Sequence, residues 1–316
     1  MNYLKYWKLE CSPFQLAGPS MQSNGSKAAS TFFDQGTVEE AIARIHFLIQ
    51  SQRRLGTIIG PSGVGKSRLL QQFCRTPLLL SKLSENSHVQ YVSIAGWSTN
   101  QFFRWVSNSV GHRADNCNLY QSAMDSISGR AALQGNLVLL IDDCDRASTE
   151  LLHAVQAMSN SLTRLTLLLA ATSSEKHPYE ADQDPAAKQV GTTQSRFAFA
   201  ALANQSQLRI ELPAWNLGQT ADYLSMMLES AGGRSAIFEA QAITRIHELA
   251  NGLVKSINQI ADLSLVAGAA RRFARVPSEL IDQICEELGL ISGTSASNWS
   301  QNDHFVNASI AVGTKF

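Results

Sequence analysis

Eight consecutive residues at positions 60–67 combine glycines, a lysine and a hydroxyl in a pattern that binds phosphate. They match the G-x-x-x-x-G-K-[ST] loop at every defined position and read Gly60, Pro61, Ser62, Gly63, Val64, Gly65, Lys66, Ser67. Glycines let the backbone wrap a phosphate with its N–H groups pointing inward, and a helix N-terminus adds the positive end of a dipole. In this chemistry Lys66 reaches the β- and γ-phosphates, and Ser67 holds Mg²⁺ through its hydroxyl. We include Arg68, the next residue, among the predicted nucleotide contacts.

The segments on either side of this loop have the patterns that its chemistry needs. Residues 55–59 form a short apolar run typical of a buried strand, and residues 67–75 carry apolar side chains at helical spacing. A strand, a glycine turn and a helix in this order favour a phosphate site over an ordinary turn. The sequence therefore predicts ATP and Mg²⁺ as ligands.

A pair of acids, Asp142 and Asp143, follows the apolar run at 137–141. A buried strand that ends in a carboxylate is the second signature of a P-loop ATPase, because the strand carries the acid to the phosphate loop. We predict that Asp142 binds Mg²⁺ together with Ser67 and that Asp143 orients the attacking water. The alternative is a simple turn, in which Asp is common. Many such ATPases carry Glu at the second position, and the shorter Asp favours ATP binding with slow hydrolysis.

Another apolar run, at 165–171, ends in Thr172. Its hydroxyl is a candidate contact to the γ-phosphate or to the water, and a threonine that satisfies nearby backbone groups is equally consistent. The candidate catalytic residues are therefore Lys66, Asp142, Asp143 and Thr172.

Composition places the chain among globular proteins without a global charge that would attract a polyanion. Its 316 residues are 44% hydrophobic and 16% charged, with a formal net charge of zero and a pI of about 7.0. The five cysteines lack metal-ligand spacing, which favours reduced thiols and a cytoplasmic location. We expect neither a signal peptide nor a membrane span, because charged residues interrupt the N-terminus and every apolar run is short.

The elements that must position these residues alternate between strand and helix patterns. Strands are expected at 55–59, 89–95, 137–141, 165–171 and 208–212, with helices between them. This pattern predicts an α/β fold, a three-layer αβα core with a parallel five-stranded sheet. A helix is expected from Thr37, which forms a capping box with Glu40.

The pattern changes after Pro213, where strands stop and four helices are expected at 219–231, 239–250, 255–270 and 277–288. We therefore predict an N-terminal segment over 1–36, an ATPase core over 37–213 and an all-helical lid domain over 214–290. Residues 291–316 are expected to form a disordered tail, and Ser173 to Ser195 a long loop.

Two further motifs make the chain resemble the ExeA/GspA-type AAA+ ATPases, relatives of the transposition ATPases TniB and MuB. The residues at 3–9, followed by Ser12-Pro13-Phe14, are similar to that family's aromatic start, which ends in Pro-Phe. The residues at 246–258 resemble its sensor-2 motif, Gly-x-Pro-Arg-x-Ile-Asn. The similarity spans most of residues 1–288 and implies a P-loop core with a helical lid.

The resemblance implies phosphate binding by Gly60 to Ser67, Mg²⁺ at Ser67 and Asp142, and water activation at Asp143. It also implies a sensor-1 role for Thr172 and a sensor-2 role for Lys255. Lys255 replaces the family's Arg and Val254 its Pro; lysine keeps the charge but lacks the bidentate fork. An arginine finger from a second copy is expected of the class, and the candidates are Arg196 and Arg209.

Three functions follow from these residues. The first is an ATP-driven oligomeric switch or motor that acts on a protein partner, of the general secretion pathway protein A type. The second is a DNA-binding regulator of the transposition type. Its only conspicuous basic cluster, Arg271, Arg272 and Arg275, is better explained as cations at a helix C-terminus, so DNA is not favoured. The third is a slow signalling NTPase, which Asp143 and Lys255 keep open.

Overall fold

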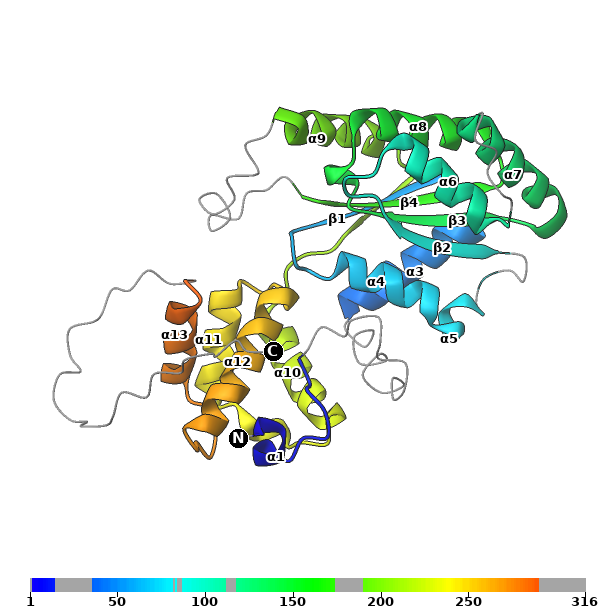
Figure 1. Ribbon diagram of the computed structural model, residues 1–316. Coiled ribbons are helices and arrows are strands. Elements are labelled where there is room, and N and C mark those ends of the chain that lie inside the picture. Colours follow the sequence, from blue (N-terminus) through cyan, green and yellow to red (C-terminus); the bar gives the residue numbers. More distant parts are fainter. Residues whose placement is uncertain are drawn as a thin grey trace, which may run out of the picture.

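The computed structural model describes residues 2–14, 36–81, 83, 87–111, 118–173 and 190–289. One parallel sheet, in the order β2-β3-β4-β1-β5, lies at its centre (Figure 1). Its strands are β1 (Leu55–Gly60), β2 (His88–Ser93), β3 (Leu137–Asp142), β4 (Leu165–Thr172) and β5 (Leu208–Glu211). This arrangement confirms the predicted parallel five-stranded sheet. Because all strands run in one direction, the glycine loop after β1 and the acids that end β3 meet at the same edge.

The central strands β1, β3 and β4 are buried on both faces of the sheet, which explains why they read as apolar runs, whereas the edge strands β2 and β5 are partly exposed and carry polar residues. On β3, Val138 and Leu140 belong to one buried cluster, and Leu139 and Ile141 belong to another. Successive side chains of a strand point to opposite faces, so each cluster covers one side of the sheet.

Helices cover the two faces in the three layers that the sequence predicts (Figure 1). One face carries α3 (Gly36–Gln50), α4 (Lys66–Arg75) and the short α5 (Pro77–Leu80). The other carries α6 (Thr99–Ser109), α7 (Leu119–Gln134), α8 (Thr149–Ser161) and α9 (Val190–Ala203). A 3₁₀ turn, η1 (Cys144–Arg146), links β3 to α8.

The described residues after β5 are mostly helical. They form α10 (Leu217–Ser230), η3 (Ser235–Ile237), α11 (Ala240–Ala250), α12 (Val254–Ala270) and α13 (Ser278–Glu287). The buried cluster on the α3 and α4 face continues into these helices. The predicted domain boundaries stay predictions, and the predicted tail at 291–316 lies outside the described residues.

The N-terminal segment packs against these C-terminal helices, although the two are far apart in the sequence. Its short helix α1 (Tyr3–Trp7) lies against α12, with the indole Nε1 of Trp7 donating to the carbonyl of Leu265 at 2.8 Å. A Cβ on Gly268 would lie 3.0 Å from the Trp7 ring, so a glycine at this position makes room for the indole. The Tyr6 hydroxyl donates to the carbonyl of Phe273 at 2.8 Å.

Two local predictions were wrong. Helix α3 begins at Gly36, and Glu40 pairs with Arg44 one turn later, so Thr37 and Glu40 form no capping box. The predicted loop to Ser195 ends early, because α9 begins at Val190. Its residues 174–189 lie outside the described part of the chain. Helices were expected between the strands, but no bounds were predicted for α7 and α8.

Candidate nucleotide-binding site

The glycine loop connects β1 to α4 at the edge where the parallel strands end. Gly63 and Gly65 have φ angles of 80° and 108°, in the left-handed region that favours glycine. Gly60 is required for space, since a Cβ there would lie 2.4 Å from the carbonyl oxygen of Leu212. Lys66 then begins α4, so the loop leads directly into a helix N-terminus, as the sequence predicts.

Lys66 is held at the mouth of this loop. Its Nζ donates to the carbonyl of Gly60 at 2.7 Å and to that of Pro61 at 2.9 Å, and the residue is only 8% exposed. A buried ammonium needs such acceptors or an anion. The side chain therefore places a positive charge where the loop would hold phosphate.

Ser67 and Asp142 meet directly, although they come from α4 and β3. The Ser67 hydroxyl is close enough to the Asp142 carboxylate to lower its pKa, and Asp142 is 2% exposed. Burial raises the pKa of Asp142 above its ordinary value, and the Ser67 hydroxyl opposes this rise. A hydroxyl and a carboxylate are the hard oxygen donors that Mg²⁺ prefers, so this pair fits the metal that the motif implies.

Two other donors hold Asp142. Its Oδ2 accepts from the hydroxyl of Tyr91, on β2, at 3.0 Å, and its Oδ1 accepts from the backbone N–H of Asp143 at 2.9 Å. Burial raises the pKa of Tyr91, so its phenol stays a proton donor at neutral pH. Sequence reasoning missed Tyr91, because a tyrosine in a strand ordinarily indicates packing.

Asp143 adopts a left-handed backbone conformation, with φ 57°, immediately after β3. Its Oδ2 accepts a hydrogen bond from the hydroxyl of Ser93 at 2.6 Å. Ser93 ends β2 and pairs in register with Asp142. The structure thus places the predicted water-orienting acid at the site and holds it with a serine that the sequence did not indicate.

Thr172 lies opposite Gly60 in the pairing of β4 with β1, beside the start of the loop. Its backbone N–H donates to Oδ1 of Asp145 at 3.3 Å, and Asp145 is 6% exposed. Asp145 is a third carboxylate at this edge that sequence reasoning missed. The signal was present in the sequence, since an acid follows the predicted pair by two positions.

The C-terminal helices contact the loop through the start of α12. The backbone N–H of Lys255 donates to the carbonyl of Gly63 at 3.0 Å. Arg68 on α4 hydrogen-bonds the hydroxyl of Tyr223 on α10, which in turn donates to Oδ1 of Asn258 at 2.7 Å. The structure therefore brings the predicted residues Arg68 and Lys255 to the contact between the loop and the helices.

The two arginine-finger candidates lie in regular structure. Arg209 is on β5 and pairs with Glu211 at 2.9 Å, which occupies its guanidinium within the chain. Arg196 is exposed within α9 rather than at the edge of a loop. An arginine finger remains a prediction for both.

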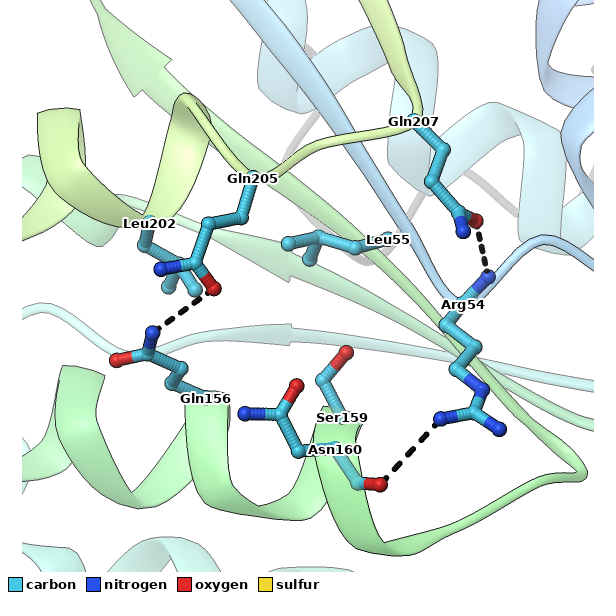
Figure 2. A pocket seen from close by; sticks show the side chains of 8 residues that line it. All are labelled: Arg54, Leu55, Gln156, Ser159, Asn160, Leu202, Gln205 and Gln207. Carbon is cyan, nitrogen blue, oxygen red and sulfur yellow. Dashed lines mark hydrogen bonds between the residues drawn. The ribbon is translucent and has the colours of Figure 1, made fainter.

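A pocket of about 180 Å³ lies at the opposite edge of the sheet, where β1 begins (Figure 2). Amide side chains line much of it: Gln156 donates to Gln205 at 2.9 Å, and the backbone N–H of Arg54 donates to Gln207 at 2.9 Å. It is separate from the glycine loop, which follows the other end of β1.

The described side chains include no group of three or more His, Cys, Asp or Glu that could hold a metal ion by itself. None of the described helices has both the length and the apolar character that a bilayer crossing requires.

The sheet order, the glycine loop and the paired serine and aspartate define a P-loop NTPase of the AAA+ fold. More particularly, residues 49–177 match the family described as an AAA domain. A comparison with curated proteins gave no match.

Solved structures of similar fold include three archaeal proteins at 14% identity. ORC2 of Aeropyrum pernix, in ADPNP and ADP complexes, has a TM-score of 0.58, and the match covers 88% of this chain and 71% of that one. Cdc6p of Pyrobaculum aerophilum has a TM-score of 0.57, with coverages of 84% and 72%. ORC1 of Aeropyrum pernix in complex with DNA has a TM-score of 0.56, with coverages of 82% and 69%. At this identity the similarity shows the fold.

Proposed function

We propose that the chain binds ATP with Mg²⁺ at residues 60–67 and hydrolyses it. The observation that carries this proposal is the approach of the Ser67 hydroxyl to the buried Asp142 carboxylate, beside the glycine loop. These two residues are far apart in the sequence, and the fold joins them as a hydroxyl–carboxylate pair beside a helix N-terminus. A pair of this kind is the metal-binding part of a P-loop site.

Each residue then has a defined task. The backbone N–H groups of the loop bind the phosphates, and Lys66 neutralises the β- and γ-phosphate charge. Ser67 and Asp142 would hold Mg²⁺, which when bound neutralises charge on the reacting phosphate. Asp143 orients water, Thr172 lies at the γ-phosphate end, and Arg68 and Lys255 couple the nucleotide to the helices. Slow hydrolysis is expected, because Asp143 is short and hydrogen-bonded to Ser93.

The biological role that we propose is an oligomeric switch or motor of the ExeA/GspA type, acting on a protein partner in the cytoplasm. The N-terminal motif packs against α12, the helix in which the sensor-2 motif ends, and this contact supports the assignment. Trp7 packs on α12 at Leu265, and Lys255 lies in the first turn of the same helix. A shift of α12 at the nucleotide would therefore move the N-terminal segment as well.

A DNA-binding regulator is the second candidate, favoured by the fold it shares with an ORC1 protein in complex with DNA. The exposed arginines 271, 272 and 275 would be its phosphate contacts. Filter binding to duplex DNA at low salt tests it. If ATP causes no retention of DNA on the filter, this candidate is rejected.

Nucleotide binding is tested by calorimetry of wild type and Lys66→Ala with millimolar Mg-ATP. We expect heat of binding and slow steady-state turnover for wild type. Lys66→Ala should lose at least about tenfold in affinity and all turnover above background, because its ammonium opposes the phosphate charge. Absence of heat with folded wild type, or equal turnover of the two proteins, would reject the proposal.

A further inference from the structure

Tyr91 forms hydrogen bonds on both sides of its hydroxyl, at the inner end of the nucleotide-binding site. It donates to Oδ2 of Asp142 at 3.0 Å, and it accepts from Nε2 of Gln71 at 3.1 Å. The three residues belong to β2, β3 and α4, so the chain of bonds crosses from the sheet to the helix that begins at the phosphate loop.

The chemistry of the partners determines the direction of these bonds. An amide nitrogen can only donate, and a carboxylate can only accept. The single proton of the phenol therefore goes to Asp142, while Gln71 occupies a lone pair of the same oxygen. A phenylalanine would fill the same space in the sheet, so packing does not explain why this residue carries a hydroxyl.

The Asp142 carboxylate is thereby held from both sides. Oδ2 is bonded to Tyr91, and Oδ1 is bonded to the backbone N–H of Asp143, which prevents rotation of the group. The Ser67 hydroxyl also lies close to the carboxylate, and it must turn a lone pair outward to bind a cation. Tyr91 and Asp143 are the two contacts on Asp142 that come from groups outside the metal-binding pair, and they keep the carboxylate aimed at the metal.

We propose that Tyr91 is a positioning residue for the divalent cation of the nucleotide, with Gln71 directing its proton to Asp142. This inference depends on the proposed Mg-ATP site. Residues behind metal ligands orient them in this way, and their loss commonly lowers metal affinity by about tenfold or more. Nucleotide held by the loop without metal does not need the orientation of Asp142.

The experiment compares wild type, Tyr91→Phe and Gln71→Met by titration with fluorescent ATP, first in EDTA and then at increasing Mg²⁺. Tyr6→Phe is the matched control, because it also removes a phenolic hydrogen bond, to Phe273 in the helical part. Binding of Mn²⁺ to the nucleotide complex, followed by electron paramagnetic resonance, gives a second readout that needs no turnover.

For Tyr91→Phe we expect the same affinity for fluorescent ATP in EDTA as wild type. The Mg²⁺ concentration that gives half of the Mg²⁺-dependent change in ATP binding should rise about tenfold, and Mn²⁺ should bind the nucleotide complex more weakly. Gln71→Met should shift the Mg²⁺ dependence in the same direction by about threefold, and Tyr6→Phe should match wild type. If Tyr91→Phe fails to fold, Gln71→Met decides alone. If wild type binds Mg-ATP and Tyr91→Phe shows the same Mg²⁺ dependence as Tyr6→Phe, the inference is overturned. Failure of wild type to bind ATP would instead reject the proposed function.

Discussion

The acid that should orient water, Asp143, is held by a neighbouring strand. Its carboxylate accepts a short hydrogen bond from Ser93, and its backbone is left-handed. A hydrogen bond to a charged group contributes about 1.5–3 kcal/mol, so release of the acid toward a water has an energetic cost. This contact is a second reason to expect slow hydrolysis. The first is that the Asp143 side chain is one methylene shorter than the Glu that many such ATPases carry.

At this scale we predict that Ser93→Ala raises ATP turnover by up to about tenfold, because it frees Asp143 at unchanged nucleotide affinity. Asp143→Glu should raise turnover as well, since the longer side chain reaches an in-line water. Steady-state phosphate release measures both. Ser230→Ala, which removes a serine hydrogen bond within α10, serves as the control. Turnover of Ser93→Ala at or below that of wild type would contradict the restraint.

Among the elements, α12 joins three parts of the chain. Its first turn contacts the glycine loop through Lys255, its middle hydrogen-bonds Tyr223 through Asn258, and its last turns receive Trp7. Gly252, just before it, has a φ of 68° and would clash with the Trp215 carbonyl if it carried a Cβ. Helix α12 is therefore fixed to the glycine loop at its start and to the N-terminal segment near its end.

We predict that Trp7→Ala lowers the free energy of unfolding by about 3 kcal/mol, because it removes a buried ring and leaves a cavity against Gly268. Urea denaturation followed by circular dichroism measures the loss. The exposed neighbour Lys5→Ala should stay within about 0.5 kcal/mol of wild type. Equal midpoints for the two variants would show that α1 is not part of the stable structure.

For the whole molecule, the charge balance is neutral and the site opens at one edge of the sheet. Ser67 is exposed beside the buried Asp142, so the proposed nucleotide site faces the surface of the chain. No partner is needed to complete the core, since both sheet faces are covered by helices of the same chain. We expect assembly to depend on the nucleotide.

We predict that size-exclusion chromatography with light scattering detects a larger species when Mg²⁺ and a non-hydrolysable ATP analogue are present. Lys66→Ala should keep the size of the nucleotide-free protein under both conditions, because it cannot bind the analogue tightly. An unchanged mass for wild type at saturating analogue would argue against the oligomeric switch.

Much of the fold followed from local patterns. The three central strands were predicted because each is an apolar run, the strand at 89–95 because of its β-branched residues, and the strand at 208–212 because Pro213 ends it. The loop was predicted because its glycines and lysine have a strict spacing. The bounds of α7 and α8 and the start of α9 at Val190 were missed. Ser93, Tyr91 and Asp145 were missed for another reason: a serine, a tyrosine and an acid have ordinary structural uses in a chain.

The sequence by itself determined the phosphate loop, the acid pair and the order of strands and helices, because each depends on residues adjacent along the chain. Only the tertiary structure decided what surrounds these groups. The parallel register places Ser93 beside Asp142, and helix packing brings Gln71 to Tyr91 and Trp7 to Leu265. Such contacts depend on burial and strand pairing between distant segments, and spacing along the chain does not specify them.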